Sequence, residues 1–450
     1  MIKLNISRDL LDVDDSAVLQ YSIDSGITWQ VLGYDQGNSD GINWYNSNII
    51  NGGNRPGGDV ISGGQNFGWT NSSDAGWVEC RHDLDALIDQ TQVVFRFAFS
   101  SNSTNAGDGF AFDNIWIGER TKYVLSEHFT NTSSASSASY NPNYNAFVTQ
   151  YQNDIIDIQY HVNTLSNDLL YSDYPAGPNA RSLYYGVIES ATTITDGNVL
   201  NNATGLWTSD SLVTLRRSLL EADFGLDLTK TINGNMLDVN LDITSYYNYN
   251  DTVDVQIVLI EKQIDATDIN SSGGIVLNGE VSFNNVVKHM LPDAGGTRID
   301  DAWTSNQIKS ISESIDLSSL NFYGVGADDL EVIAFVQNSS TKEVYQTAST
   351  DTSYVPIVLS EEEAELSDLD FSFSLYPNPT QGNIFVMFNQ AIRGSAELKI
   401  FNELGQTIDT KQITNGVGYN FDMANYANGI YFVNIIHDGK VYNKRFILRK

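Results

Sequence analysis

Apolar and polar residues alternate along most of this chain, which is the period-two pattern of β-strands. Residues 18–23 and 93–99 follow it near the N-terminus, with a Gly-rich loop at residues 51–58 between them. The pattern returns further along the chain, at residues 237–243, 253–260, 330–338 and 341–346. Turn residues separate these runs, so the pattern predicts packed sheets of short strands.

One stretch, residues 121–220, breaks this pattern because strands alternate there with helices. Residues 123–129 and 155–162 predict strands, and residues 141–152 between them predict a helix. Strand–helix–strand order favours an α/β layer in which helices pack on a sheet.

These patterns predict a multidomain, mainly β protein, and 450 residues suffice for three or four domains. The expected segments are a jelly-roll sandwich (1–120), an α/β domain (121–220), a β-sandwich (221–355), an acidic linker (356–370) and a terminal β-sandwich (371–450).

Composition narrows the class of protein. A net charge of −32 argues against nucleic acid or anionic membrane surfaces as partners, because both would repel the chain. With 41% hydrophobic residues the chain has ample material for folded cores. No apolar run is long enough to span a bilayer. The single cysteine, Cys80, rules out a disulfide within the chain.

The C-terminal segment differs from the rest in charge and in motifs. From Phe371 onward there are 8 Lys and Arg against 5 Asp and Glu, whereas the whole chain has 24 against 56. The segment opens on Tyr-Pro-Asn-Pro, continues with two runs that predict separate strands at residues 382–386 and 398–402, and closes with Asn-Gly-Ile-Tyr and a basic strand. The motif residues are Tyr376, Pro377, Asn378, Pro379, Gly382, Gly405, Asn428, Gly429, Tyr431, Lys444 and Arg445.

This order of motifs resembles the C-terminal sorting domain (type A) of the type IX secretion system, by which Bacteroidota export proteins across the outer membrane. The resemblance implies an immunoglobulin-like β-sandwich and a cargo that passes through the periplasm to the cell surface or the medium. It also implies the partners: the outer-membrane translocon, its shuttle protein and, where the tail is removed, a sortase.

Export by this route also needs a signal peptide. Residues 1–15 contain no apolar core segment and no small-residue cleavage site. We therefore expect the native protein to extend upstream of Met1.

Three stretches, at residues 127–132, 185–197 and 335–344, resemble Bacteroidota outer-membrane proteins that join a thioredoxin-like domain to a β-sandwich. Redox-active members carry Trp-Cys-x-x-Cys where this chain has residues 133–137, with Ser134 and Ser137 in place of the two cysteines. Ala191 stands where the usual cis-proline is expected. Serine cannot form a disulfide, so the resemblance implies a degenerate, non-redox site and no enzyme.

Two other chemistries are conceivable near this site. His128 with Ser134 or Ser137 would make a nucleophile pair only if a third group oriented the base. Because serine is abundant in this chain, a solvated loop is favoured. The five histidines also show no paired zinc-ligand spacing.

The run at residues 107–117, with the strand before it, resembles jelly-roll modules similar to MAM domains. Asp108 and Asp113 flank that strand, and Asp14 lies near the first strand, so these carboxylates predict a calcium site if the two strands are neighbours. The alternative is that they cap turns.

Aromatic residues Trp44, Tyr45, Trp69 and Trp77 lie among Gly- and Asn-rich loops, where they either stack on sugar rings or anchor the core. The sequence favours a secreted, non-catalytic protein that binds a glycan or surface polymer. The alternatives are the accessory and sorting region of a secreted hydrolase, such as a metallopeptidase with an upstream catalytic domain, and a structural surface protein without a ligand.

Overall fold

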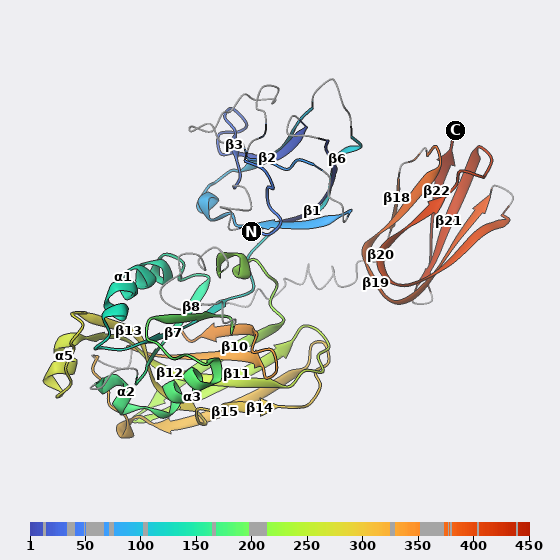
Figure 1. The fold of residues 1–450 in the computed structure, drawn as a ribbon. Coiled ribbons are helices and arrows are strands. Elements are labelled where there is room, and N and C mark those ends of the chain that lie inside the picture. Colours follow the sequence, from blue (N-terminus) through green and yellow to red (C-terminus); the bar gives the residue numbers. More distant parts are fainter. Residues whose placement is uncertain are drawn as a thin grey trace. The chain divides into compact units, whose positions relative to one another are not determined.

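Figure 1 shows the computed structural model of the chain, which forms two compact units, Met1–Pro356 and Ile357–Lys450. The structure describes the chain except for residues 12–14, 34–40, 49, 51–66, 72–75, 102–106, 164–167, 198–213, 325–328, 352–372, 377, 379, 403–404 and 438–439. The expected acidic linker, 356–370, therefore lies outside the described residues.

The N-terminal segment is a β-sandwich of two three-stranded antiparallel sheets. One sheet has the order β4 (Val78–His82), β1 (Ile2–Asp9), β6 (Gly109–Ile117), and the other β3 (Gln30–Val31), β2 (Ser16–Ser22), β5 (Val94–Ser100). A short 3-10 helix, η2, spans Asp85–Leu87. Alternate residues of β1 meet β2 in the core, so the period-two pattern places one face of each strand inside.

The hairpin loop after β2 is held by a carboxylate. The backbone N–H of Thr28 donates to Asp24 Oδ1 at 2.8 Å, and the Trp29 indole donates to the Gly26 carbonyl at 2.9 Å. The hydrogen bonds from Thr28 and Ser22 lower the pKa of Asp24 to about 2. The Ser-x-Asp-x-Gly-x-Thr-Trp sequence thus forms one turn of the sandwich.

An eight-stranded sheet organises the rest of the first unit. Its main path runs β17 (Val344–Ser349), β16 (Leu330–Asn338), β12 (Val253–Asp265), β13 (Ser282–Leu291), β8 (Ile155–His161), β7 (Val124–Thr130), β9 (Thr192–Thr195), and β14 (Thr297–Ile299) pairs with β12. β7 and β8 are parallel and every residue of both is buried. This is the environment of a strand covered on both faces.

Three helices lie beside the parallel strands: α1 (Ala135–Gln150), α2 (Leu169–Asp173) and α3 (Ala176–Tyr185). A further helix, α5 (Ala266–Ser271), contacts β12. α1, α2 and α3 contact β8, and α3 also contacts β13. The strand–helix–strand order predicted for residues 123–162 is confirmed as β7–α1–β8. The helix begins earlier than predicted because Ser134, not a residue near Pro142, caps it.

A three-stranded sheet completes the sandwich: β10 (Phe224–Asn233), β11 (Met236–Ser245) and β15 (Ile308–Asp316), followed by the 3-10 helix η3 (Leu317–Ser319). Leu237, Val239, Leu241 and Ile243 of β11 pack into one core with the inward residues of β12 and β16.

The predicted boundary between residues 220 and 221 does not separate two sheets. β8, from one side of that boundary, pairs in parallel with β13, from the other side, through Gln159 and Val286. The two predicted domains therefore share one sheet. The alternation of apolar and polar residues shows where strands lie but not which strands pair. The sequence therefore predicts a boundary where the helices end, although the sheet continues across it.

The C-terminal unit is an immunoglobulin-like sandwich of β18 (Phe373–Tyr376), β19 (Asn383–Asn402), β20 (Thr407–Asp422), β21 (Gly429–His437) and β22 (Lys440–Leu448). Residues 382–386 and 398–402, predicted as separate strands, belong largely to the single 20-residue strand β19. Register shifts inside β19 let its two halves pair with different neighbours, β18 at one end and β21 at the other.

Candidate functional site

The two serines at the expected redox positions form the start of α1. Ser134 is the N-cap, and its hydroxyl accepts a hydrogen bond from the Ser137 backbone N–H at 3.2 Å. The Ser137 hydroxyl in turn accepts one from the Asn131 N–H at 3.3 Å. Both side chains are buried, so the expectation of a solvated loop is wrong. Ser134 thus satisfies a backbone donor that the helix start leaves open, and Ser137 satisfies one in the loop before the helix.

Ala191 lies next to these serines, as the resemblance implied. Its backbone has a φ of 65°, and its N–H donates to the Phe129 carbonyl at 2.7 Å. The neighbouring Ser190 hydroxyl donates to Ser134 Oγ at 2.7 Å. The structure thus brings the loop of Ser134 and Ser137 next to the loop of Ala191, and hydroxyl groups make the contact between the two loops.

Both ring nitrogens of His128 are hydrogen-bonded to residues other than Ser134 and Ser137. Nδ1 lies 2.9 Å from Thr193 Oγ1, and Nε2 lies 2.9 Å from Asn141 Oδ1. Burial lowers the pKa of His128 to about 4, so the ring is neutral at neutral pH. An amide oxygen can only accept, so Nε2 carries the proton. The Ser–His pair considered from the sequence is therefore absent in these described residues.

A second histidine nearby is held by a carboxylate. His161 Nδ1 lies 2.8 Å from Asp168 Oδ2, and both side chains are almost fully buried. Burial acts to raise the pKa of Asp168, but the His161 ring and the backbone N–H groups of Thr132 and Tyr171 outweigh it and lower the pKa. The ring is 1% exposed, so a substrate has no open approach to it.

The expected calcium ligands do not converge among the described residues. Asp108 and Asp113 are separated by roughly 16 Å of extended strand. The Asp108 backbone donates to Asp9 Oδ2 at 3.1 Å, and Asp113 Oδ1 accepts from the Asn114 N–H at 2.8 Å. Asp14 lies outside the described residues, within which no group of three potential metal ligands occurs. Calcium stays a prediction.

Three of the four aromatic residues considered for sugar stacking belong to the core. Trp44, Tyr45 and Trp69 are fully buried, whereas Trp77 is 39% exposed. Cys80 is buried beside them, and burial raises the pKa of its thiol to about 12. The core alternative is thus confirmed for the three buried rings.

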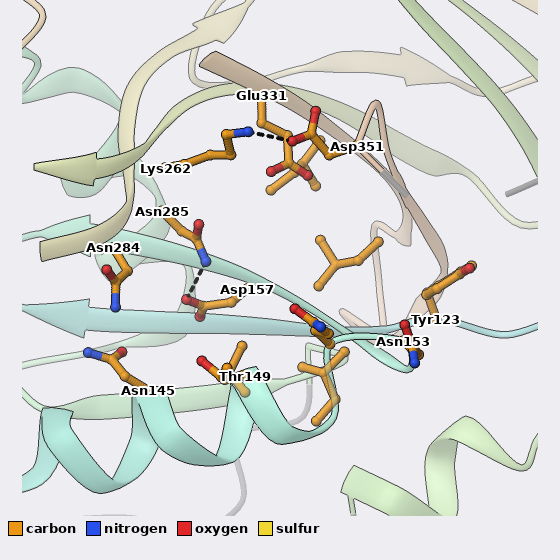
Figure 2. A pocket seen from close by; sticks show the side chains of 15 residues that line it. Tyr123, Asn145, Thr149, Asn153, Asp157, Lys262, Asn284, Asn285, Glu331 and Asp351 are labelled. Atoms are coloured by element: carbon orange, nitrogen blue, oxygen red, sulfur yellow. Dashed lines mark hydrogen bonds and ion pairs between the residues drawn. The ribbon is translucent and has the colours of Figure 1, made fainter. Parts of the chain in front are cut away.

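Sequence reasoning missed a cavity of about 600 Å³ on one face of the eight-stranded sheet (Figure 2). Its wall draws on α1, β8, β12, β13 and β16. It is lined by Tyr123, Asn145, Val148, Thr149, Gln152, Asn153, Ile155, Ile156, Asp157, Lys262, Asn284, Asn285, Glu331, Ile333 and Asp351. These residues are spread over more than half of the chain, so no local motif signals the site.

Charged groups in this cavity perturb one another. Burial raises the pKa of Asp157 to about 6, although Tyr144, Gln159 and Asn285 donate hydrogen bonds to its carboxylate. Burial, with the nearby Asp351 carboxylate, raises the pKa of Glu331 to about 7. Perturbed carboxyls gathered in a cavity mark it as a candidate binding site.

In the C-terminal unit, Asn378 joins the opening motif to the last strand. Its side-chain oxygen accepts from the Ile447 N–H at 2.9 Å, and its side-chain nitrogen donates to the Arg445 carbonyl at 3.2 Å. The backbone of Thr380 continues this pairing with Ile447 at 2.8 Å. Pro377 and Pro379 lie outside the described residues, and Tyr376 ends β18.

The closing motif also binds the C-terminal end of the last strand. Asn428 Oδ1 accepts from the backbone N–H of Lys450 at 2.9 Å, and Gly429 pairs with Leu448. The Tyr431 hydroxyl donates to the Ala427 carbonyl at 2.6 Å. The first and last motifs thus both hold β22 in place.

The remaining motif residues are turns or surface positions. Gly405 has a φ of +75°, which favours glycine, and its N–H donates to the Asn402 carbonyl at 3.0 Å. Gly382 precedes β19, and its N–H donates to Thr380 Oγ1 at 3.2 Å. Lys444 and Arg445 are exposed on β22.

Residues 374–449 match the family model described as the secretion system C-terminal sorting domain. The C-terminal unit is a type IX sorting domain. The match extends from β18 to the residue after β22, which is the region that the motif contacts hold together.

A type IX sorting domain directs export to the cell surface or the extracellular space, and implies contact with the type IX machinery. None of the described helices is both long and apolar enough to cross a membrane. The sorting domain gives a destination for the cargo and leaves the chemistry of residues 1–356 open.

Several solved structures are similar to part of the chain. HBP35 of Porphyromonas gingivalis is 14% identical, with coverage of 74% of this chain and 100% of its own and a TM-score of 0.41. A protein of Agrobacterium tumefaciens is 14% identical over 52% of this chain and 95% of its own, with a TM-score of 0.32. A domain of the outer membrane lipoprotein Omp28 of Porphyromonas gingivalis is 15% identical over 28% of this chain and 86% of its own, with a TM-score of 0.19.

These likenesses are too distant to assign a function to residues that precede the sorting domain. A comparison with curated proteins returned no match. The role of residues 1–356 therefore has to be argued from their own surface and cavities.

Proposed function

We propose that residues 1–356 are a non-catalytic binding unit that the sorting domain delivers to the outside of the cell, where it attaches to a glycan or surface polymer. In this proposal the β7–α1–β8 region is a degenerate thioredoxin-like scaffold. Two observations support it. The Ser134 hydroxyl accepts from the Ser137 N–H and the Ser137 hydroxyl accepts from the Asn131 N–H. Cys80 lies in the N-terminal sandwich, and the pKa of its thiol is raised.

The observation that carries the binding role is the surface of β6. Phe112, Ile115, Trp116 and Ile117 are 46%, 49%, 39% and 53% exposed. Among the described residues β6 pairs with β1 alone, so its other edge is open. Contiguous exposed apolar residues on a strand edge are typical of a contact surface. An exposed indole such as Trp116 also offers a flat apolar face to a sugar ring.

Retention of the full-length chain on a broad set of immobilised polysaccharides tests this role. We expect retention that Trp116→Ala weakens at least tenfold. Trp77→Ala is the matched control, because Trp77 is equally exposed at 39% and precedes β4 on the opposite side of β1. Retention should survive that change.

No retention on any polysaccharide would refute the binding role and favour the accessory-region alternative. Equal losses in both variants would refute the assignment to β6. Disulfide reduction of insulin by the full-length chain would refute the non-catalytic part, since the proposal expects none.

A further inference from the structure

The cavity in Figure 2 arises because the sheet is wider than the helix that covers it. α1 packs on β8, whereas Lys262 of β12, Asn284 of β13 and Glu331 of β16 lie beyond the helix. β8 and β13 pair through a single residue pair, and Asn285 next to it has a φ of 49°. The two strands therefore diverge at the point where the cavity opens. Its volume, about 600 Å³, is that of a small-molecule site.

Most charged groups of the cavity have protein partners. Lys262 Nζ donates to Asp351 Oδ2 at 2.7 Å. The Asp157 carboxylate accepts from Asn285 at 3.1 Å and from Gln159 at 3.0 Å, as well as from the Tyr144 hydroxyl. These contacts satisfy Asp157 and Asp351 without a ligand.

Glu331 is the exception. Among the described residues no group donates a hydrogen bond to its carboxyl, although the side chain is half-buried in the wall of the cavity. Asp351 and Asp157 repel its negative charge, and Lys262 and Lys230 attract it without reaching hydrogen-bond distance. A half-buried carboxylate without a protein donor has only water to bind, and an ammonium group would supply both a positive charge and donors.

The rest of the wall suits a ligand that is partly polar and partly apolar. The side chains of Asn284, Thr149, Gln152 and Asn153 have no hydrogen-bond partner within the described part of the chain, so they are available to a ligand. Ile333, Val148 and other aliphatic side chains supply an apolar surface. Figure 2 shows Asn145 and Asn284 at one end of the cavity and the Lys262–Glu331–Asp351 group along one side.

We propose that this cavity binds a small molecule that carries a primary ammonium group, with Glu331 as the residue that receives the ammonium. The neighbouring amides hold hydroxyl or carbonyl groups of the same molecule. A metal ion fits less well, because the described residues contain no cluster of three potential ligands. The inference does not depend on the surface of β6.

The amine could come from a sugar or from a peptide, and paired probes distinguish the two sources. Titration calorimetry of the full-length chain would compare glucosamine with N-acetylglucosamine, and Nα-acetyl-lysinamide with its Nε-acetylated form. We expect at least one amine to bind, and its acetylated partner to bind at least tenfold more weakly. Absence of binding by both amines, or equal affinity for an amine and its acetylated form, would overturn the proposal.

Substitutions test the role of Glu331. Glu331→Gln keeps the shape of the side chain and should weaken amine binding about tenfold or more, since it removes the charge that faces the ammonium. Glu189→Gln is the matched control, because Glu189 is exposed and lies outside the cavity. Unchanged affinity in Glu331→Gln would refute the assignment.

A second variant separates loss of charge from loss of fold. Lys262→Gln removes the cation that neutralises Asp351, so it should tighten amine binding several-fold. A structural defect would instead weaken it, and weaker binding in this variant would count against the proposal.

The pH dependence gives an independent readout. Because the pKa of Glu331 is raised to about 7, part of the carboxyl is protonated at pH 6.5. Ammonium binding there should release a proton, which appears as a dependence of the binding heat on buffer ionisation. Glu331→Gln should lose that dependence, and its persistence in the variant would point to another titrating group, with Asp157 first because its pKa is about 6.

Discussion

Replacing Arg181 with methionine tests whether the shared sheet of the first unit unfolds as one body. Arg181 on α3 donates two hydrogen bonds to the Glu127 carboxylate on β7, both at 2.8 Å. It also donates to Gln337 Oε1 on β16 at 3.0 Å. All three side chains are buried. This network therefore ties a strand of the predicted α/β domain to a strand of the predicted sandwich.

Methionine would leave Glu127 as a buried charge with the Tyr185 hydroxyl, at 2.6 Å, as its remaining donor from this network. Removing one partner of a buried ion pair costs about 3–5 kcal/mol. Since about 1.36 kcal/mol is a factor of ten, amide exchange limited by opening of the sheet should accelerate roughly a hundredfold or more. Hydrogen exchange of the full-length chain, read by mass spectrometry on peptides from β7 and β16, measures it.

The result that supports one cooperative sheet is an equal acceleration in both strands. Arg298→Lys is the control, because Arg298 is 60% exposed and lysine keeps a cation beside the buried Asp254 carboxylate, so exchange should stay unchanged. The double change Arg181→Met with Glu127→Gln removes the unpaired charge and should restore part of the protection. Faster exchange in β7 with β16 unaffected would refute the reasoning and support two independent domains.

Three further outcomes follow from the geometry. Asn378→Ala should destabilise the sorting domain by about 1–3 kcal/mol, because two backbone groups of β22 lose their partner. Asn420→Ala is the control, because Asn420 is exposed and its loss should not destabilise the domain. Amide hydrogen exchange in β22 measures the difference. Burial lowers the pKa of His128 from its ordinary value of 6.5 to about 4, so its contribution of about 3 kcal/mol is present above pH 6.5 and is lost as pH falls toward 4. His128→Gln should flatten that part of the acid-unfolding curve, and an unchanged curve would contradict it. The Cys80 thiol should resist iodoacetamide at pH 8 until urea unfolds the chain; rapid labelling of the folded protein would show that it is accessible.

The sorting domain was predictable because its signals are local. Asn378 and Asn428 lie in short motifs, and both bond the backbone at the C-terminal end of the last strand, β22. The merging of two predicted strands into β19 was not predictable in this way. The residues between them carry no alternation that separates a bent strand from a loop, and only pairing with β20 shows that the strand continues.

The position of Ser134 and Ser137 between a strand and a helix was predictable, but their environment was not. The burial of these serines does not follow from the sequence, because it depends on Ser190 and on the loop before Ala191. A serine run looks like a solvated loop when its partners lie far along the chain. The predicted domain boundary near residue 220 is misplaced for the same reason, because the pairing of β8 with β13 across it joins residues far apart in the sequence.

The cavity shows why a candidate site can escape sequence reasoning altogether. Glu331 is the one charged residue of β16, whose other residues are mostly apolar and buried. Asp157 is likewise an acidic residue within the buried strand β8. Each alone suggests a tolerated polar residue. Only the sheet order, which places β16, β12, β13 and β8 side by side, brings these carboxyls over one hollow. The Arg181 network stabilises the same sheet order from the opposite end of β16, because Gln337 and Glu331 lie on this strand. Loss of that network should therefore loosen the cavity as well, and amine binding in Arg181→Met should weaken together with the protection of β16.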